Sequence, residues 1–278
     1  MRASVPPLLV LLLAAGACGA PDPSEADRAE GPASASPGPD FSGGRWVDLT
    51  HPFSPETVYW PTARGFDLDT VAFGPTEGGY FYAAFEFSAS EHGGTHLDAP
   101  LHFAEGRHAA DEIPLERLIA PAVVVDVSGR ASPDYEVGPV DLQEWEAAHG
   151  RIPDGAILLV RTGWGERYGD RAAYLGTARG GPEAVAELHF PGLHPDAARW
   201  LVEERDVGAV GIDTPSLDRG QSTTFETHVV LYSRNVPGFE NVAMPAELPA
   251  IGGWVFALPM KIRGGSGGPL RIVAWVPG

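Results

Sequence analysis

The densest group of chemically reactive side chains in the sequence is a short segment that contains His92, His96, Asp98 and His102. Two imidazoles and one carboxylate are ligands that zinc and manganese accept, and three protein ligands leave coordination positions open for water, as a catalytic site requires. The paired glycines between the first two histidines, and Pro100 after them, argue against a regular helix. We therefore expect these side chains to converge from a tight turn and to form a metal site.

A single histidine in such a segment is more often a helix cap or a satisfied polar contact. Four potential ligands at short spacing, beside glycines that allow close backbone approach, make that structural explanation the weaker one here. Five of the histidines outside this segment fit surface, cap or loop positions, and we assign no role to them: His51, His108, His149, His189 and His194.

Three other features of the sequence could belong to a functional site, but each also has a structural explanation. Ser216 lacks the surroundings of a nucleophile elbow, and Gly264–Gly268 lacks the Lys-Ser/Thr ending of a phosphate loop, so we interpret both as turns. Asp213 follows an apolar run, where a binding residue, a helix cap or a turn hydrogen bond can each occur.

The elements that must position the histidine cluster are those of a mixed α/β fold. Continuous apolar runs over 122–127, 156–160 and 207–212 predict strands that are covered on both faces. The segment 141–149 ends at a glycine and 195–204 begins with a proline, which predicts two helices. We predict a single α/β domain with a mixed central sheet flanked by helices.

Two further strand predictions concern the ends of this sheet. Apolar and polar residues alternate over Phe81–Ser88, which predicts a half-buried strand that leads into the histidine cluster. The segments 254–262 and 270–276, on either side of a glycine-rich turn, predict a β-hairpin that ends the fold.

Composition excludes several classes of function. The chain has 278 residues and a formal net charge of −18, which repels nucleic-acid phosphates and anionic lipid headgroups. We therefore expect no nucleic-acid partner and no membrane binding through a basic patch. The one cysteine lies near the N-terminus, so disulfides and thiolate ligands are excluded for the folded part.

The N-terminal region reads as an export signal followed by a tether. Residues 1–18 combine an early arginine, a short apolar stretch and small residues, and they resemble a bacterial lipoprotein signal in which Cys18 receives the lipid. Cleavage near Ala20, which would remove that cysteine, is the alternative. Residues 19–44 are rich in Pro, Ser and Gly and predict a disordered tether before a domain at 45–278. This predicts a protein of the bacterial periplasm or cell envelope, attached to the membrane only through its lipid.

The run HGGTHLDAPLH, which begins at His92, resembles the HxGTHxDxPxH signature of the cyclase family, which includes bacterial kynurenine formamidases and isatin hydrolases. The resemblance extends from about Val47 to the C-terminus. It implies a swivelling β/β/α-like fold and a metal-dependent hydrolase. The other matching segments are Tyr59-Trp60-Pro61, Arg161-Thr162-Gly163-Trp164, Gly211-Ile212-Asp213-Thr214 and Lys261-Ile262-Arg263-Gly264-Gly265-Ser266-Gly267.

The resemblance also implies roles for individual residues. It implies that His92, His96 and Asp98 bind the metal and that His102 donates and accepts the proton. It also implies that Trp60 stacks on the substrate, for which ordinary core packing is the alternative. A metal would activate water and polarise the substrate carbonyl, while the imidazole of His102 would return a proton to the leaving nitrogen.

Formamidase-like members of the family add a histidine and, twelve positions later, a glutamate as further ligands. His228 and Glu240 have that spacing, whereas isatin hydrolase-like members have one metal, so the choice between one and two zinc or manganese ions stays open. The expected activity is hydrolysis of a C–N amide bond, in an arylformamide such as N-formylkynurenine or in a cyclic amide such as isatin. The family implies a homo-dimer or tetramer with pocket walls partly supplied by a neighbouring subunit.

Two other classes of function compete with the enzyme. A non-catalytic exported metal- or ligand-binding lipoprotein would fit the N-terminal signal, but it would not need His102 beside its ligands. Nothing specific in the sequence favours a structural scaffold. The segment 165–190 is longer than the formamidase pattern, which weighs against kynurenine chemistry.

Overall fold

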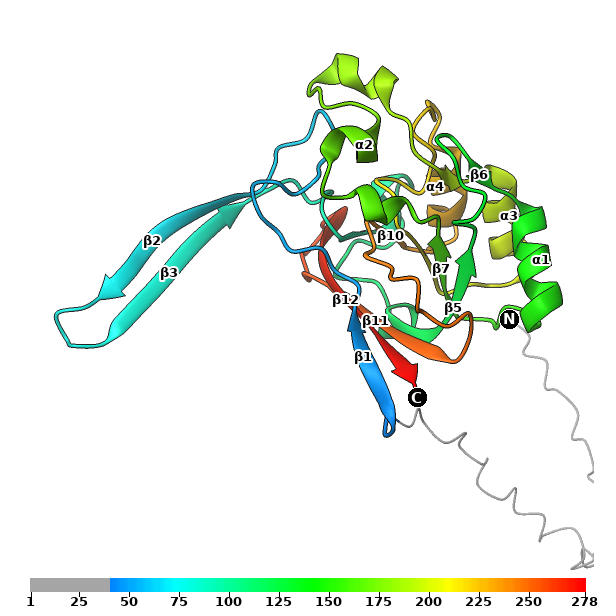
Figure 1. Ribbon diagram of the computed structural model, residues 1–278, viewed down its shortest axis with the longest axis horizontal. Coiled ribbons are helices and arrows are strands. Elements are labelled where there is room, and N and C mark those ends of the chain that lie inside the picture. Colours follow the sequence, from blue (N-terminus) through cyan, green and yellow to red (C-terminus); the bar gives the residue numbers. More distant parts are fainter. Residues whose placement is uncertain (1–40) are drawn as a thin grey trace, which may run out of the picture. The chain divides into compact units, whose positions relative to one another are not determined.

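The computed structural model of the protein describes residues 41–278 (Figure 1). The expected export signal 1–18, its lipid site Cys18 and residues 19–40 of the expected tether lie outside the described residues. Within the described part of the chain, none of the helices has both the length and the apolar character needed to cross a membrane.

One mixed sheet of eight strands organises residues 41–278 (Figure 1). Its strands are β1 (Gly44–Asp48), β4 (His96–Asp98), β5 (Ile119–Asp126), β7 (Ile157–Arg161), β9 (Ala209–Ile212), β10 (Gly238–Glu240), β11 (Gly253–Pro259) and β12 (Gly267–Pro277). Their order is β1-β12-β11-β5-β7-β9-β10-β4, with β5, β7, β9 and β10 parallel and the other pairs antiparallel. Because β12 also pairs with β4, the sheet closes on itself.

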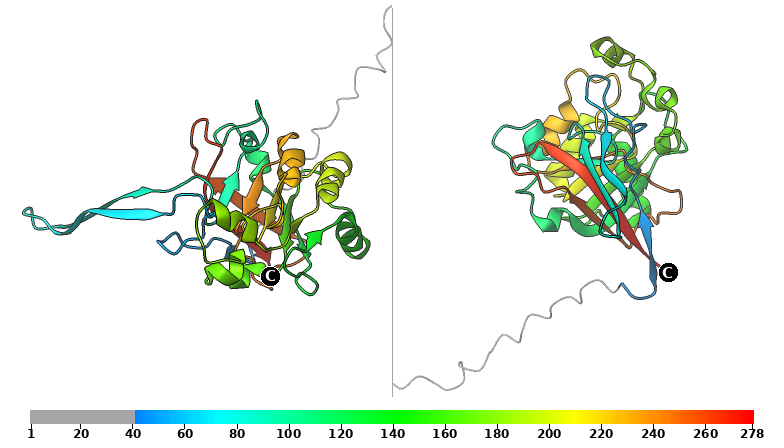
Figure 2. Two further views of the ribbon diagram at one scale, coloured as in Figure 1. Left: turned by 90° about the horizontal axis from the view of Figure 1, so that it is seen from above. Right: turned by 90° about the vertical axis from the view of Figure 1, so that its left-hand side faces the viewer.

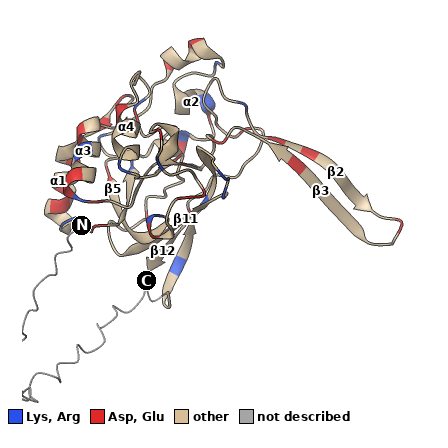
Figure 3. Ribbon diagram, turned by 180° about the vertical axis from the view of Figure 1, so that it is seen from behind, with Lys and Arg blue, Asp and Glu red and all other residues tan. Residues whose placement is uncertain are grey.

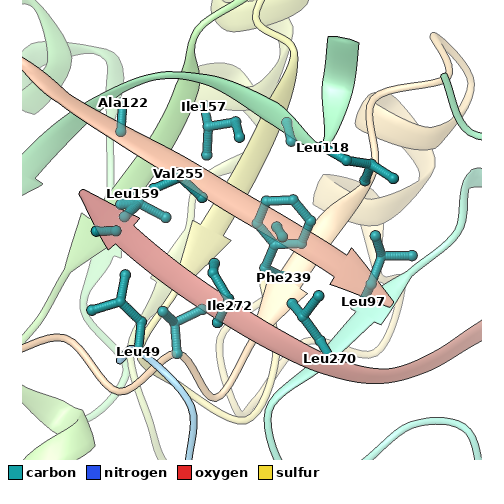
Figure 4. Close-up of a cluster of buried hydrophobic side chains, with 14 of the residues drawn as sticks. Leu49, Leu97, Leu118, Ala122, Ile157, Leu159, Phe239, Val255, Leu270 and Ile272 are labelled. Carbon is teal, nitrogen blue, oxygen red and sulfur yellow. The ribbon is translucent and has the colours of Figure 1, made fainter. Parts of the chain in front are cut away.

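Buried apolar side chains fill both sides of this closed sheet. Val124 of β5 belongs to the cluster enclosed by the strands, whereas its neighbours Val123 and Val125 belong to a second cluster shared with the helices. Figure 4 shows the enclosed cluster, to which β4, β5, β7, β10, β11 and β12 contribute. The arrangement has two walls of strands and an outer layer of helices, which confirms the predicted α/β fold and the three predicted buried strands.

The helices that cover the sheet are α1 (Pro139–His149), α3 (Pro195–Glu204) and α4 (Glu226–Tyr232). The Asp141 carboxylate accepts a hydrogen bond from the Gly138 N–H and caps the start of α1, which ends before Gly150. The side chain of His194 accepts from the Asp196 N–H at the start of α3, so one of the histidines without an assigned role is a cap. Both predicted helices are confirmed, and so is the C-terminal hairpin of β11 and β12.

The strand predicted over 81–88 exists, but the prediction that it is half-buried was wrong. It is β3 (Phe81–Ser88), which pairs only with β2 (Asp67–Pro75) in a ribbon that projects from the rest of the described domain (Figures 1 and 2). No other described element covers either face of this ribbon, so its large side chains stay exposed. They include Leu68, Val71, Phe73, Tyr80, Phe81, Tyr82, Phe85 and Phe87.

The insertion at 165–190 forms short helices rather than a loose loop. These are the 3-10 helices Trp164–Arg167 and Pro182–Glu187, and α2 (Arg171–Leu175) between them. Together with Val58 they build a third buried cluster, against which Trp60 packs. The remaining short elements are β6 (Glu136–Val137), β8 (Gly192–Leu193) and the 3-10 helices Pro100–His102 and Leu115–Arg117.

Asp213, at the end of β9, has the turn-bonding role that the sequence left open. Its buried carboxylate accepts hydrogen bonds from the Thr162 N–H (2.8 Å), the Thr162 hydroxyl (2.6 Å) and the Gly163 N–H (2.8 Å). These bonds join the ends of two parallel strands, so the residue supports the fold.

Acidic side chains are spread over the helices of the described surface, and many arginines lie beside them (Figure 3). Arg205 pairs with Glu146, and Arg199 pairs with Glu226 on α4. The described arginines therefore sit largely among carboxylates, in keeping with the acidic balance of the sequence.

Candidate metal centre

The register between β4 and β10 brings the first ligand candidates together. Residue 96 lies directly opposite Glu240 in this antiparallel pair. Leu97 and Phe239 point into the apolar cluster enclosed by the strands. Because side chains alternate along a strand, His96, Asp98 and Glu240 point to the opposite face, where α4 packs.

His228 and His92 complete the group from two other elements. His228, on α4, places its Nε2 atom 3.1 Å from Glu240 Oε1 and 3.5 Å from Asp98 Oδ2. His92, in the loop before β4, places its Nδ1 atom 2.6 Å from Asp98 Oδ1. The five side chains thus form two triads that share Asp98, each with ligand atoms within 4.8 Å of one another. The first triad is His92, His96 and Asp98, and the second is Asp98, His228 and Glu240.

The two glycines after His92 are required by the walls of this site. A Cβ atom on Gly93 would lie 2.0 Å from the ring of Tyr59. Gly94 has a φ of +58°, and a Cβ atom there would lie 2.8 Å from Phe53 and Thr57. Any larger residue would displace the loop, so the glycines allow His92 and β4 to approach the pocket wall.

The hydrogen bonds of His96 identify which of its ring nitrogens is free. Its Nδ1 lies 2.9 Å from the Gly94 carbonyl oxygen, which can only accept, so Nδ1 carries the proton. Its Nε2 is buried, has no hydrogen-bond partner in the described protein, and lies 3.1 Å from Asp98 Oδ1 and 3.5 Å from Glu240 Oε2. A nitrogen lone pair that faces two carboxylates is repelled unless a proton or a metal ion lies between them.

His228 shows the same arrangement in the second triad. Its Nδ1 lies 2.5 Å from Asp218 Oδ2, so an N–H donated to that carboxylate leaves Nε2 as a lone pair. This lone pair faces Glu240 and Asp98. A carboxylate behind a ligating histidine is the usual second partner in metal sites, because it fixes the tautomer of the ring.

The charge balance of the site favours a bound positive charge, either a proton on an imidazole or a metal ion. Burial would raise the pKa of Asp98, but the neighbouring imidazoles, with His92 foremost, hold it well below its ordinary value. Burial would lower the pKa of His96, but its contacts with Asp98 and the charge of Glu240 raise it to about 8. The nitrogen and oxygen donors suit zinc or manganese, so the residues fit a metal of this kind.

His102 lies beside the first triad without belonging to it. Its ring stacks on the ring of His92, with centroids 3.8 Å apart and planes 17° apart, and it keeps part of its surface exposed. Burial against the pocket wall and the nearby imidazoles lower its pKa to about 4, although Asp98 opposes this. A neutral imidazole at the rim of the site can accept a proton at neutral pH.

A cavity of about 380 Å³ opens over the two triads. Trp60 lines the cavity, and its ring packs edge-to-face against two phenylalanines. The ring centroids are 6.4 Å from Phe190, at an interplanar angle of 79°, and 6.3 Å from Phe225, at 60°. Trp60 therefore combines the packing role and the pocket position that the sequence left as alternatives. Besides the triads, the lining comprises Val58, Tyr59, Trp60, Ala63, Ser90, Gly93, His102, Phe103, Pro215, Ser216, Phe225 and Asn241.

Sequence reasoning missed the residues that hold the ligands. The Tyr232 hydroxyl donates to Asp98 Oδ2 at 2.9 Å, and a Cβ atom on Gly238 would lie 2.6 Å from that hydroxyl. Tyr232 follows His228 by four positions on α4, a spacing that places both side chains on one helix face and could have revealed it. Asp218 had no comparable signal, because only the folded chain brings it to the ring of His228.

Comparison with known proteins agrees with this geometry. The sequence profile of the Cyclase family matches residues 47–219. The isatin hydrolase of Roseibium aggregatum is 36% identical over 209 residues, which cover 72% of this chain and 77% of that protein. The kynurenine formamidase of Salinibacter ruber is 28% identical over 237 residues, which cover 82% of this chain and 95% of that protein.

A solved structure shows the same similarity in three dimensions. The isatin hydrolase A from Ralstonia solanacearum has a TM-score of 0.76 and 36% sequence identity, over 84% of this chain and 92% of that one. The family profile spans more than half of the 278 residues and includes the first triad. The chain therefore belongs to the cyclase family.

Proposed function

We propose that this protein is a metal-dependent hydrolase that opens the C–N bond of an uncharged cyclic aromatic amide, of which isatin is an example. The observation that carries the proposal is the convergence of imidazole lone pairs and buried carboxylates on the floor of a largely apolar cavity. The similarity to isatin hydrolases supports the choice of reaction.

The donor set has room for two zinc or manganese ions, because the triads use opposite oxygens of Asp98. Oδ1 faces His92 and His96, whereas Oδ2 faces His228. When bound, such a metal polarises the substrate carbonyl and activates water for attack on it. The protein residues hold the ligand atoms in place, and Tyr232 fixes the orientation of the shared carboxylate.

His102 is the residue best placed to move the proton. Its ring is neutral at neutral pH, lies next to the first triad and lines the cavity. It can take a proton as water attacks and return it to the nitrogen that leaves. An amide nitrogen leaves poorly without a proton, so this transfer controls the breakdown of the tetrahedral adduct.

The cavity lining favours an uncharged aromatic substrate over an amino acid. Trp60, Phe103 and Phe225 offer apolar ring surfaces, and none of the described residues that line the cavity is a lysine or arginine. N-formylkynurenine carries an ammonium and a carboxylate group on its amino-acid tail, and the lining offers no cationic side chain for that carboxylate. A bicyclic lactam has no such tail and can pack its aromatic ring against these side chains.

The substrate prediction compares these two amides. Purified full-length protein should lose isatin hydrolysis after treatment with a chelator and regain it with zinc or manganese, and it should show a higher kcat/KM for isatin than for N-formylkynurenine. Trp60→Ala should raise KM for isatin by about 2- to 10-fold, whereas Trp60→Phe should change it less, because an aromatic pair contributes about 0.5–1.5 kcal/mol. Steady-state kinetics with both substrates measures this.

Two outcomes would contradict the proposal in different ways. A higher kcat/KM for N-formylkynurenine would assign the enzyme to the formamidases. A protein that holds its metal and binds such amides without hydrolysing any of them would instead support a non-catalytic binding lipoprotein.

The mechanistic prediction concerns His102. His102→Ala should keep its metal content and melting temperature while kcat falls by roughly 10²-fold or more, because only the proton transfer is removed. Metal analysis, thermal unfolding and kinetics on one preparation measure this, with His149→Ala on the exposed end of α1 as the matched control. If metal content falls together with activity, His102 is a ligand instead.

The location proposal rests on the N-terminal sequence alone. We propose that Cys18 carries the lipid and that the protein is anchored in the bacterial cell envelope. Mass spectrometry of the mature N-terminus should find a lipidated cysteine, and Cys18→Ser should move the protein from the membrane fraction to the soluble fraction. A mature chain that starts after Ala20 without lipid would show ordinary secretion.

The exposed ribbon of β2 and β3 supports a homo-oligomer, as a dimer or tetramer. A ribbon that exposes aromatic rings on both faces is a surface that a second copy of the chain can cover. The double variant Phe73→Ser/Phe85→Ser should shift the protein toward a monomer in size-exclusion chromatography with light scattering. Trp46→Ser, an exposed aromatic position on β1, is the control, and an unchanged mass for the double variant would reject this interface.

A further inference from the structure

A chain of hydrogen bonds connects the C-terminal hairpin to His92. His92 Nε2 lies 2.8 Å from the hydroxyl oxygen of Ser266, in the turn before β12. That hydroxyl donates to Glu91 Oε2 at 2.7 Å, and the Ser266 backbone N–H donates to the same oxygen at 3.0 Å. Glu91 therefore binds the serine at two points, and the serine contacts the ring.

The number of protons shared by Glu91, Ser266 and His92 decides which ring nitrogen of His92 carries a proton. A serine hydroxyl has one proton, and Ser266 gives it to Glu91, so its oxygen can only accept from His92. In the neutral ring the N–H is then on Nε2. Nδ1 of that tautomer has a lone pair, 2.6 Å from Asp98 Oδ1, on the side where the first triad converges, and a metal can take it.

The opposite tautomer would remove His92 from the triad. If Ser266 donated its proton to Nε2, or were absent, Nδ1 could carry the ring proton and donate it to Asp98 Oδ1 across the same 2.6 Å. That hydrogen bond would occupy the nitrogen and the oxygen that the first triad needs. The two states differ by one proton position, so the acceptor of the serine proton selects between them.

The fold holds Ser266 firmly in this position. The Ala99 N–H donates to the Ser266 carbonyl at 2.8 Å, and Gly267 pairs with Asp98 as β12 meets β4. A Cβ atom on Gly267 would lie 2.7 Å from His92 Cε1, so only glycine lets the turn pass this close to the ring. The glycine-rich segment, which the sequence predicts to be a turn, thus also packs against His92 of the metal centre.

The other two imidazoles do not depend on a hydroxyl. The Nδ1 atom of His96 donates to the Gly94 carbonyl, and that of His228 donates to the Asp218 carboxylate. Both partners can only accept, so those tautomers are fixed directly. His92 contacts a group that can donate or accept, and it needs Glu91 to fix the direction.

We propose that Glu91 and Ser266 are positioning residues that place the ring proton of His92 on Nε2 and so keep its Nδ1 free for the metal. The inference rests on the proposed metal-dependent function. In the described structure Glu91 hydrogen-bonds to Ser266 and does not line the cavity, so it reaches the ring of His92 through the serine.

The test measures metal affinity rather than activity. Ser266→Ala and Glu91→Ala, made in the full chain, should each bind zinc about 10- to 100-fold more weakly in a competition with a chromophoric chelator, the range expected for loss of an outer partner of a ligand. Glu91→Gln keeps an oxygen that can accept the serine proton and should restore most of the affinity. Ser128→Ala, which removes a partly buried hydroxyl that contacts Arg161, should bind zinc as the wild type does.

A double-variant cycle and a spectrum separate positioning from general damage. In the His92→Ala background, Ser266→Ala should cause no further loss, because its effect passes through that ring. Proton–nitrogen correlation spectra of the zinc-loaded wild type should show the His92 proton on Nε2. A proton on Nδ1, an unchanged affinity in both single variants, or an equal loss with and without His92 would overturn the proposal.

Failure of the wider function would look different. A wild-type protein that binds neither zinc nor manganese would reject the proposed hydrolase and this inference with it. If the wild type binds metal and the Ser266→Ala and Glu91→Ala variants bind it with the same affinity, only the role of Glu91 and Ser266 is rejected.

Discussion

The site depends on buried negative charge that needs a positive charge beside it. Asp98 and Glu240 are buried side by side, and the imidazoles around them are bonded on their outer edges, so that their inner nitrogens face the carboxylates and need either a proton or a metal ion there. Buried charges of one sign, surrounded by further electron pairs, are costly without a compensating positive charge. A bound cation provides that charge, which is why the outer hydrogen bonds matter as much as the ligand atoms.

The closed sheet is what makes this arrangement possible. β4 has only three residues, yet it pairs with both β10 and β12, and its Leu97 lies in the enclosed apolar core. Burial of that side chain fixes the register, since a shift by one residue would turn His96 and Asp98 into the core. The metal ligands are therefore positioned by the same alternation that packs the interior.

The sequence predicted the parts of the protein that are encoded locally. The apolar runs gave β5, β7 and β9, the proline and glycine signals gave α1 and α3, and the spacing around His92 gave the ligand candidates. The predicted burial of β3 was wrong, because alternating apolar and polar residues indicate a strand but do not show whether another element covers its apolar face. Asp218 and Ser266 were also missed, since their roles come from contacts between segments that are distant in the sequence.

The floor and the walls of the cavity have different origins, and this explains how one family can contain different amidases. The floor is fixed by strand register and by glycines that accept no side chain. The walls include Trp60 and Phe225, and the insertion at 165–190 forms the buried cluster against which Trp60 packs. Changes in these walls alter the shape and charge of the pocket without disturbing the ligand atoms, so substrate choice can change while the metal chemistry stays the same.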